Sequence, residues 1–158
     1  ALQEALVAWV VEPPFNDYAQ ARAKGLLPER LEQMGRRTLK MWAHAETLSG
    51  HEQLVAWHET RKRAKAARYA WEAAVPALGE PATEAARAWE EVTESLGIVQ
   101  DAVVAREAIK ELADVAVAHD ESAFTYGVLY QLEIDRTADF HGQASAAIRT
   151  ARDLGIPH

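Results

Sequence analysis

Apolar residues recur every three to four positions along most of this chain, and strict alternation of apolar with polar residues is scarce. That spacing is typical of amphipathic helices, so it predicts an all-α protein. Breaks in the pattern coincide with proline, glycine and serine, which end helices or start new ones. The breaks divide the chain into predicted helices over residues 1–11, 28–48, 51–78, 81–118 and about 120–154.

The predicted boundaries rest on particular residues. Pro13 and Pro14 end the first helix, because the residue before a proline avoids the helical conformation. Pro28 suits the first turn of the second helix, and Asp120 or Ser122 would cap the last one. Long helices joined by short loops indicate an antiparallel bundle of about four long helices after a short lead-in helix.

No internal repeat or change of composition divides the sequence, so we expect one domain over residues 1–158. Tryptophan side chains are expected to pack in the core or between helices. The five are Trp9, Trp42, Trp57, Trp71 and Trp89. The chain begins at Ala1 inside an apolar-periodic stretch with no capping residue, which suggests a fragment that lacks a preceding segment.

Charge and composition narrow the kinds of function. The chain has 17 Lys and Arg against 24 Asp and Glu, a net charge of −7, which argues against coating nucleic acid through an overall positive field. It contains no cysteine, which excludes disulfides and thiolate metal sites. No apolar run reaches the roughly 18 residues of a membrane span, and the N-terminal stretch lacks the features of a secretory signal. We therefore expect a soluble, cytoplasmic protein in which any anion site is a local patch.

The predicted helix over residues 51–78 carries such a patch. Six of its side chains share one side, because their spacing of i, i+3, i+4, i+7, i+10 and i+11 follows the turn of a helix. They are His58, Arg61, Lys62, Lys65, Arg68 and Tyr69, called here the basic stripe. Residues 58–68 hold five Lys or Arg, at positions 61, 62, 63, 65 and 68, against Glu59 alone, a local charge of +4. Like charges at this spacing repel one another, so the stripe indicates an anion-binding surface.

The side of this helix opposite the basic stripe reads as a core face, from Thr60 through Trp71 to Leu78. The preceding helix adds further basic residues at the spacing of one stripe. These are Arg30, Arg37, Lys40 and His44. Two neighbouring helices would then line one basic groove. The alternative is an ordinary solvated face, whose basic side chains pair with acids such as Glu59 and Glu72.

The run His58-x-x-Arg61-x-x-x-Lys65-x-x-Arg68-Tyr69 resembles the signature of CHAD domains, the conserved-histidine α-helical domains. Leu96-Gly97-x-x-Gln100-Asp101 is similar to a second element of that family, and Gly127 to a glycine in its last helix. The resemblance extends from the Glu-Pro-Pro segment at residues 12–14 to the end of the chain. It covers the second of the two related helical bundles of a complete CHAD domain, and the N-terminal bundle is absent.

This resemblance implies binding of inorganic polyphosphate in a basic channel between two bundles, and in some members association with polyphosphate granules. The positions that carry over from the family motif are His58, Arg61, Lys65, Arg68 and Tyr69. Helical facing adds Lys62, Arg37, Lys40 and Arg136 to the predicted site. Gly97 is expected to permit a close approach of helices, and Asp101 to orient a cation of the basic stripe. Without the other bundle, we expect exposed apolar surface and self-association.

Other functional classes find little support. No histidine follows a glutamate by three residues, as in di-iron bundles, and no His-Glu-x-x-His zinc motif occurs. Nucleophile elbows, phosphate-binding loops and dinucleotide fingerprints are also absent from the sequence. We therefore expect a non-catalytic protein with no cofactor or metal. The remaining alternative is a helical protein-interaction or regulatory module that does not bind polyphosphate, and it is favoured if the two basic stripes point to different sides.

Overall fold

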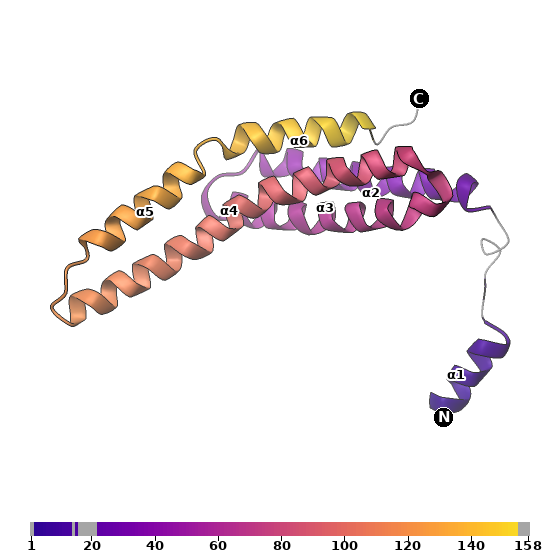
Figure 1. The fold of residues 1–158 in the computed structure, drawn as a ribbon, viewed down its shortest axis with the longest axis horizontal. Helices are drawn as coiled ribbons and strands as arrows, with labels where there is room; N and C mark the ends of the chain where they lie inside the picture. Colours follow the sequence, from indigo (N-terminus) through magenta and orange to yellow (C-terminus); the bar gives the residue numbers. More distant parts are fainter. Residues whose placement is uncertain (1, 14, 16–21, 155–158) are drawn as a thin grey trace.

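A computed structural model of the chain describes residues 2–13, 15 and 22–154. The described residues form helices and no strands, which confirms the predicted all-α class (Figure 1). The helices are α1 (Leu2–Val11), α2 (Ala23–Ala45), α3 (Gly50–Leu78), α4 (Glu80–Ala118), α5 (Phe124–Arg136) and α6 (Phe140–Leu154). No helix in the described part of the chain is long and apolar enough to cross a membrane.

Helices α2, α3 and α6 pack with the first half of α4 into a bundle (Figure 1). Within this bundle, α3 packs against both α2 and α4, and α6 packs along α4. The 39-residue α4 continues beyond the bundle, and α5 folds back along its projecting half. We call this projection, residues 102–136, the arm. Helix α1 lies apart from the bundle and buries none of its side chains.

Small residues bring the helices of the bundle close together around three buried tryptophans, Trp42, Trp71 and Trp89. The predicted core face of α3 is confirmed, since Thr60, Ala64, Ala67, Trp71 and Ala74 are all buried. Alanines likewise dominate the buried side of α4, and Trp89 between them is 1% exposed. Gly35 on α2 makes room for this indole, because a Cβ there would lie 3.2 Å from the ring of Trp89. Close packing of this kind rests on matched volumes rather than on long apolar side chains.

Helix α6 is tied to α2 and α3 by an aromatic and polar cluster. Trp57 stacks on Trp42 at 6.5 Å between ring centroids and meets the ring of Phe140 edge-on at 5.1 Å. His141 pairs with the carboxylate of Glu46, to which the Trp57 indole also donates at 3.4 Å. The prediction of packed tryptophans is thus confirmed for four of the five. It is wrong for Trp9, which is 63% exposed because α1 packs on no other helix.

Several predicted boundaries hold and two are wrong. Helices α3 and α4 are separated by Gly79 alone, whose φ of 71° is open to glycine, and α4 runs through Gly97 without a break. Helix α2 begins at Ala23, so Pro28 lies inside it rather than at its first position. The predicted last helix is in fact two, α5 and α6. Its break at Thr137 turns Phe140 toward the bundle core. Two residues used above, Ala1 and Pro14, lie outside the described part of the chain.

Candidate anion-binding face

The basic stripe runs along α3 beside α4. His58, Lys62 and Tyr69 are exposed, whereas Arg61, Lys65 and Arg68 are half-buried toward the neighbouring helix. The α-helical period places them together, as predicted, and the packing of α4 decides how much of each side chain remains open to solvent.

Arg61 is held against α4 by a backbone contact. Its Nε donates to the carbonyl oxygen of Thr93 at 3.2 Å, and its guanidinium lies over Gly97. A Cβ at Gly97 would lie 3.3 Å from Arg61 Nη2, so this glycine makes room for an arginine side chain rather than for a helix backbone. Within residues 22–154, neither Arg61 nor Lys65 forms an ion pair. These two residues therefore keep an uncompensated positive charge.

Arg68 is in the opposite situation, because two carboxylates hold it. Its Nε lies 2.7 Å from Glu72 Oε1 on α3, and its Nη2 lies 2.7 Å from Glu90 Oε1 on α4. The hydrogen bond with Glu72 raises the pKa of Arg68, and the charges of Glu90 and Glu72 add to the effect. The guanidinium also lies 5.9 Å from the centre of the Tyr69 ring. For Arg68, therefore, the structure agrees with the alternative given above, an ordinary solvated face whose basic side chains pair with acids.

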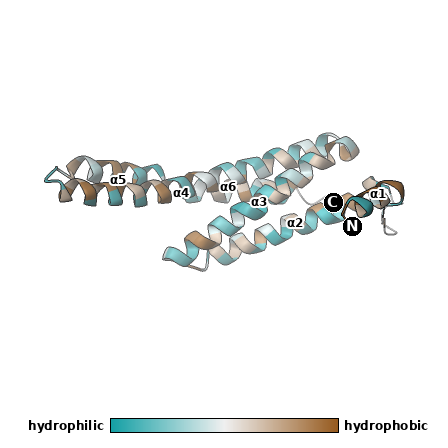
Figure 2. Cartoon of the chain, turned by 90° about the horizontal axis from the view of Figure 1, so that it is seen from below, coloured by the Kyte–Doolittle hydropathy of each residue, from teal (hydrophilic) through white to brown (hydrophobic). Residues whose placement is uncertain are grey.

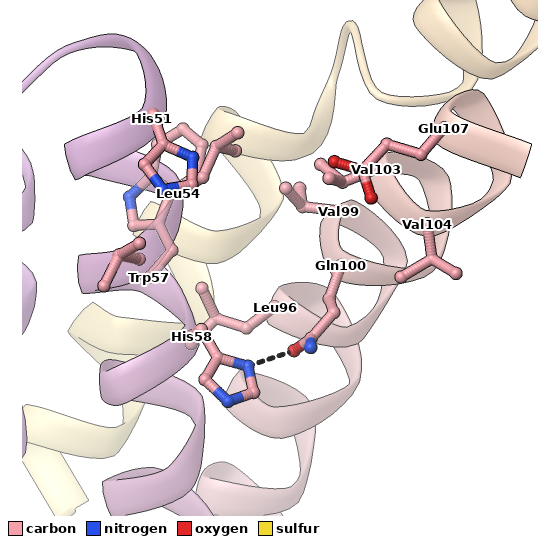
Figure 3. Close-up of a pocket in the computed structure, with 11 residues that line it drawn as sticks. His51, Leu54, Trp57, His58, Leu96, Val99, Gln100, Val103, Val104 and Glu107 are labelled. Atoms are coloured by element: carbon pink, nitrogen blue, oxygen red, sulfur yellow. Dashed lines mark hydrogen bonds between the residues drawn. The ribbon is translucent and has the colours of Figure 1, made fainter. Parts of the chain in front are cut away.

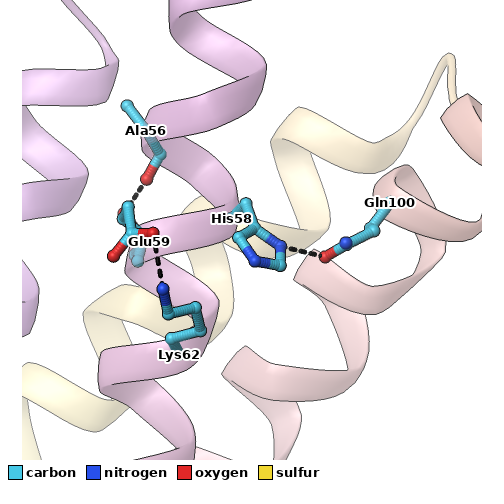
Figure 4. Close-up of polar contacts among 6 residues, drawn as sticks. Ala56, His58, Glu59, Lys62 and Gln100 are labelled. Carbon is cyan, nitrogen blue, oxygen red and sulfur yellow. Dashed lines mark hydrogen bonds and ion pairs between the residues drawn. The ribbon is translucent and has the colours of Figure 1, made fainter.

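The outer part of the stripe mixes one ion pair with one inter-helix hydrogen bond (Figure 4). Lys62 Nζ lies 2.7 Å from Glu59 Oε1, and this hydrogen bond lowers the pKa of Glu59. His58 Nδ1 donates to Gln100 Oε1 on α4 when that nitrogen carries the proton. The role predicted for Asp101 is wrong: Asp101 is exposed and makes no hydrogen bond or ion pair in the described chain. One residue earlier in the helix, Gln100 points to the stripe instead.

The two basic stripes do not line one groove. On the α2 side of α3, Arg37 and Arg63 line a pocket of about 140 Å³ with Met34, Thr38 and Ala66. Arg61 and Arg68 contact α4, which lies on the other side of α3. The expected common groove is therefore wrong, because α3 sits between α2 and α4.

The other two predicted residues lie on different helices from the basic stripe. Lys40 is exposed on α2. Arg136 lies on α5, which packs along α4, and its nearest carboxylate is Glu133 at 3.7 Å. The structure thus brings together His58, Arg61, Lys62, Lys65, Arg68 and Tyr69 and leaves Arg37, Lys40 and Arg136 apart from them.

Sequence reasoning missed an apolar pocket at one end of the stripe (Figure 3). It measures about 220 Å³ and lies between the first turns of α3 and the middle of α4. Leucine and valine side chains of both helices line it, and His51, His58, Gln100 and Glu107 supply its polar atoms. Sequence alone offered one signal, the repeat of Leu96, Val99 and Val103 on one side of α4. No group of three or more His, Cys, Asp or Glu side chains suited to a metal ion occurs among the described residues.

Comparisons with known proteins point to one family. The family model described as CHAD domain matches residues 1–110. Two uncharacterized proteins of Mycobacterium tuberculosis, from strains CDC 1551 / Oshkosh and ATCC 25618 / H37Rv, are each 38% identical over 99 residues. The aligned part is 63% of this chain and 18% of each relative, so the chain spans less than a fifth of their length. No solved structure is significantly similar. The family match ends within α4, so Gly127 and helices α5 and α6 lie beyond it.

Proposed function

This chain belongs to the CHAD domain family, and we propose that it binds inorganic polyphosphate, or a similar polyanion, through the basic stripe of α3 without catalysing a reaction. The proposal places it in the cytoplasm, and at polyphosphate granules where these form. The observation that carries it is the state of Arg61 and Lys65. Both are positively charged, lie one turn apart and lack an acidic partner within residues 22–154.

Arg61 is the best-positioned phosphate ligand of the stripe. Its Nε is occupied by the Thr93 carbonyl, which orients the plane of the guanidinium and leaves the terminal nitrogens for phosphate oxygens. Arginine presents several donors in a planar fork, so an arginine oriented before binding loses less side-chain entropy when phosphate arrives. Lys65 adds a mobile charge one helical turn, about 6 Å, further along α3.

The cations of the stripe that are paired with carboxylates, Lys62 and Arg68, would bind polyphosphate by exchanging those carboxylates for phosphate oxygens. The pair of Lys62 with Glu59 and the pairs of Arg68 with Glu72 and Glu90 are all at least partly exposed, and an ion pair near the surface contributes little free energy. Phosphate oxygens can therefore replace the carboxylates at small cost. His58 contributes charge only when protonated, and Gln100 holds its ring at the end of the stripe.

The test is a titration with long-chain polyphosphate at several salt concentrations. The variant Arg61→Gln/Lys65→Gln/Arg68→Gln removes three charges and keeps good helix formers. We expect its affinity to fall roughly a hundredfold, and the slope of log affinity against log salt to decrease by about two to three. The matched control Arg87→Gln/Arg149→Gln/Arg152→Gln removes the same charge from α4 and α6, and should change both quantities much less.

Equal losses in the two variants would mean attraction without a site, and unchanged binding by the first variant would refute the assignment of the stripe. A second candidate, the protein-interaction module, is favoured by the two carboxylates that hold Arg68 and by the separation of the two basic stripes. It predicts no measurable polyphosphate binding even at low salt.

A further inference from the structure

The arm exposes many large apolar side chains to solvent. Nine of them lie on residues 102–136, several on the brown segments of α4 and α5 (Figure 2). They are Val104, Leu112, Val115, Val117, Phe124, Val128, Leu129, Leu132 and Ile134. A pair of helices has no interior in which to hide such residues. Contiguous apolar patches of a few hundred Å² mark interaction sites on soluble proteins.

Most of these side chains share one side of the arm. Buried Ala116 on α4 and half-buried Tyr126 and Tyr130 on α5 mark the sides on which the two helices meet. In an antiparallel pair, residues that are offset from the contact side by the same angle around each helix axis, counted along the sequence, lie on the same outer face of the pair. On that face lie Val104, Leu112, Val115, Leu129 and Leu132, called here the arm face, each between 42% and 58% exposed, whereas Val128 lies on the side of α5 directly opposite α4. Val117, Phe124 and Ile134 follow in the opposite direction and lie on the other face.

We propose that the arm face binds the arm face of a second copy of this chain, so that two arms form an antiparallel four-helix bundle. A two-fold axis between Leu112 and Leu129 would place the apolar residues of each copy against those of the other. A patch that fits itself about a two-fold axis gives a closed dimer. The five side chains expose on the order of 500 Å² of apolar surface per copy, which with a polar rim approaches the roughly 600 Å² per partner of a small stable interface.

Charge along the arm favours the antiparallel arrangement. Asp120 and Glu121 lie at the tip, and Arg136 lies at the base, where its one ion-pair contact with another described residue is a loose one, 3.7 Å from Glu133. At 1.5 Å per residue, the tip acids and Arg136 are both about 10–14 Å from the axis, on opposite sides of it. Each Arg136 would therefore meet the tip acids of the other copy. In a parallel pairing, like charges would meet at both ends.

This proposal does not depend on polyphosphate binding. The family match ends at residue 110, so most of the arm lies outside the segment that carries the family assignment. The arm also projects beyond the bundle (Figure 1), with Val104 at its base beside the first turns of α3.

The test is the molar mass of the chain by light scattering and sedimentation, from about 1 to 200 µM, the range in which a micromolar dimer would dissociate. We expect a monomer–dimer equilibrium. Leu112→Glu/Leu132→Glu should weaken the dimer at least tenfold. Val117→Glu/Phe124→Glu adds the same charges to more exposed positions on the other face and should leave the equilibrium unchanged. Circular dichroism checks that helix content is kept in both variants.

A second set of variants keeps the apolar residues and so guards against unfolding of the arm. Arg136→Glu and Glu121→Arg should each weaken the dimer, and the double variant should restore it, because the exchanged charges again face each other. A monomer at every concentration overturns the proposal. A dimer that survives Leu112→Glu/Leu132→Glu but is lost with Val7→Glu on α1 would move the interface to that exposed helix, and would also overturn it.

Discussion

Replacement of Gly97 by alanine separates two effects that the structure sets against each other. Alanine in the interior of a helix is more stable than glycine by about 1 kcal/mol. The new Cβ would lie 3.3 Å from Arg61 Nη2 and 3.4 Å from Nε, so the guanidinium must move by a few tenths of an ångström. The hydrogen bond from Arg61 to Thr93 is already 3.2 Å long, and such a movement takes it beyond the normal range.

The loss of that bond offsets the gain in helix stability. A hydrogen bond made by a charged group contributes about 1.5–3 kcal/mol, and a half-exposed guanidinium recovers part of this from water, which leaves a loss of about 1 kcal/mol. We therefore expect Gly97→Ala to change the free energy of unfolding by less than about 1 kcal/mol in either direction. In an Arg61→Ala background the conflict is absent, and the same replacement should stabilise by about 1 kcal/mol.

Urea unfolding followed by tryptophan fluorescence measures the stability of the four proteins in this double-mutant cycle: the unchanged chain, Gly97→Ala, Arg61→Ala and the double variant. The expected coupling energy between the two positions is about 1 kcal/mol. Its absence would refute the account of Gly97 as a space for Arg61. A loss of more than about 3 kcal/mol for Gly97→Ala in both backgrounds would show that the glycine is needed for helix packing instead.

The buried core, the Lys62–Glu59 pair and the lack of a metal-ligand cluster among the described residues each lead to a further prediction. Trp89→Ala should cost about 3–5 kcal/mol of unfolding free energy, because the indole is 1% exposed, whereas Trp9→Ala should cost less than about 0.5 kcal/mol, because α1 packs on no other helix. Lys62→Ala should raise the pKa of Glu59 toward 4.5 in an NMR titration. In the unchanged protein, the contribution of the Lys62–Glu59 pair is fully present above pH 4.5 and is lost as the pH falls through the lowered pKa. EDTA should leave the melting temperature unchanged, and a fall would reveal a metal requirement.

The candidate site was only partly predictable. The period of the helix places His58, Arg61, Lys65 and Arg68 on one side of α3, and this follows from local geometry alone. The local charge of +4 was misleading, because it counted only neighbours in the sequence. Glu90 lies 22 positions after Arg68 and becomes its ion-pair partner only when α4 packs on α3.

The break of the last predicted helix and the exposure of Trp9 were unpredictable for a related reason. The stretch predicted as the last helix, about residues 120–154, carries a continuous helical pattern, but the chain must turn at Thr137 for Phe140 to reach the bundle core. The residues of α1 have the composition of a buried helix, yet none of them is buried in this chain. Apolar periodicity shows which side of a helix seeks burial, and it does not show whether another helix is there to cover it.

The sequence by itself therefore determined the helical class, the core face of α3 and the membership of the basic stripe, since each depends on contacts within about four residues. Only the tertiary structure decided that Arg37 and Arg61 lie on different sides of α3, that Gly97 holds open a space for a guanidinium, and that α4 extends into an arm with an uncovered apolar face. These features depend on which helix lies beside which, and that choice is made by packing and volume across the whole bundle.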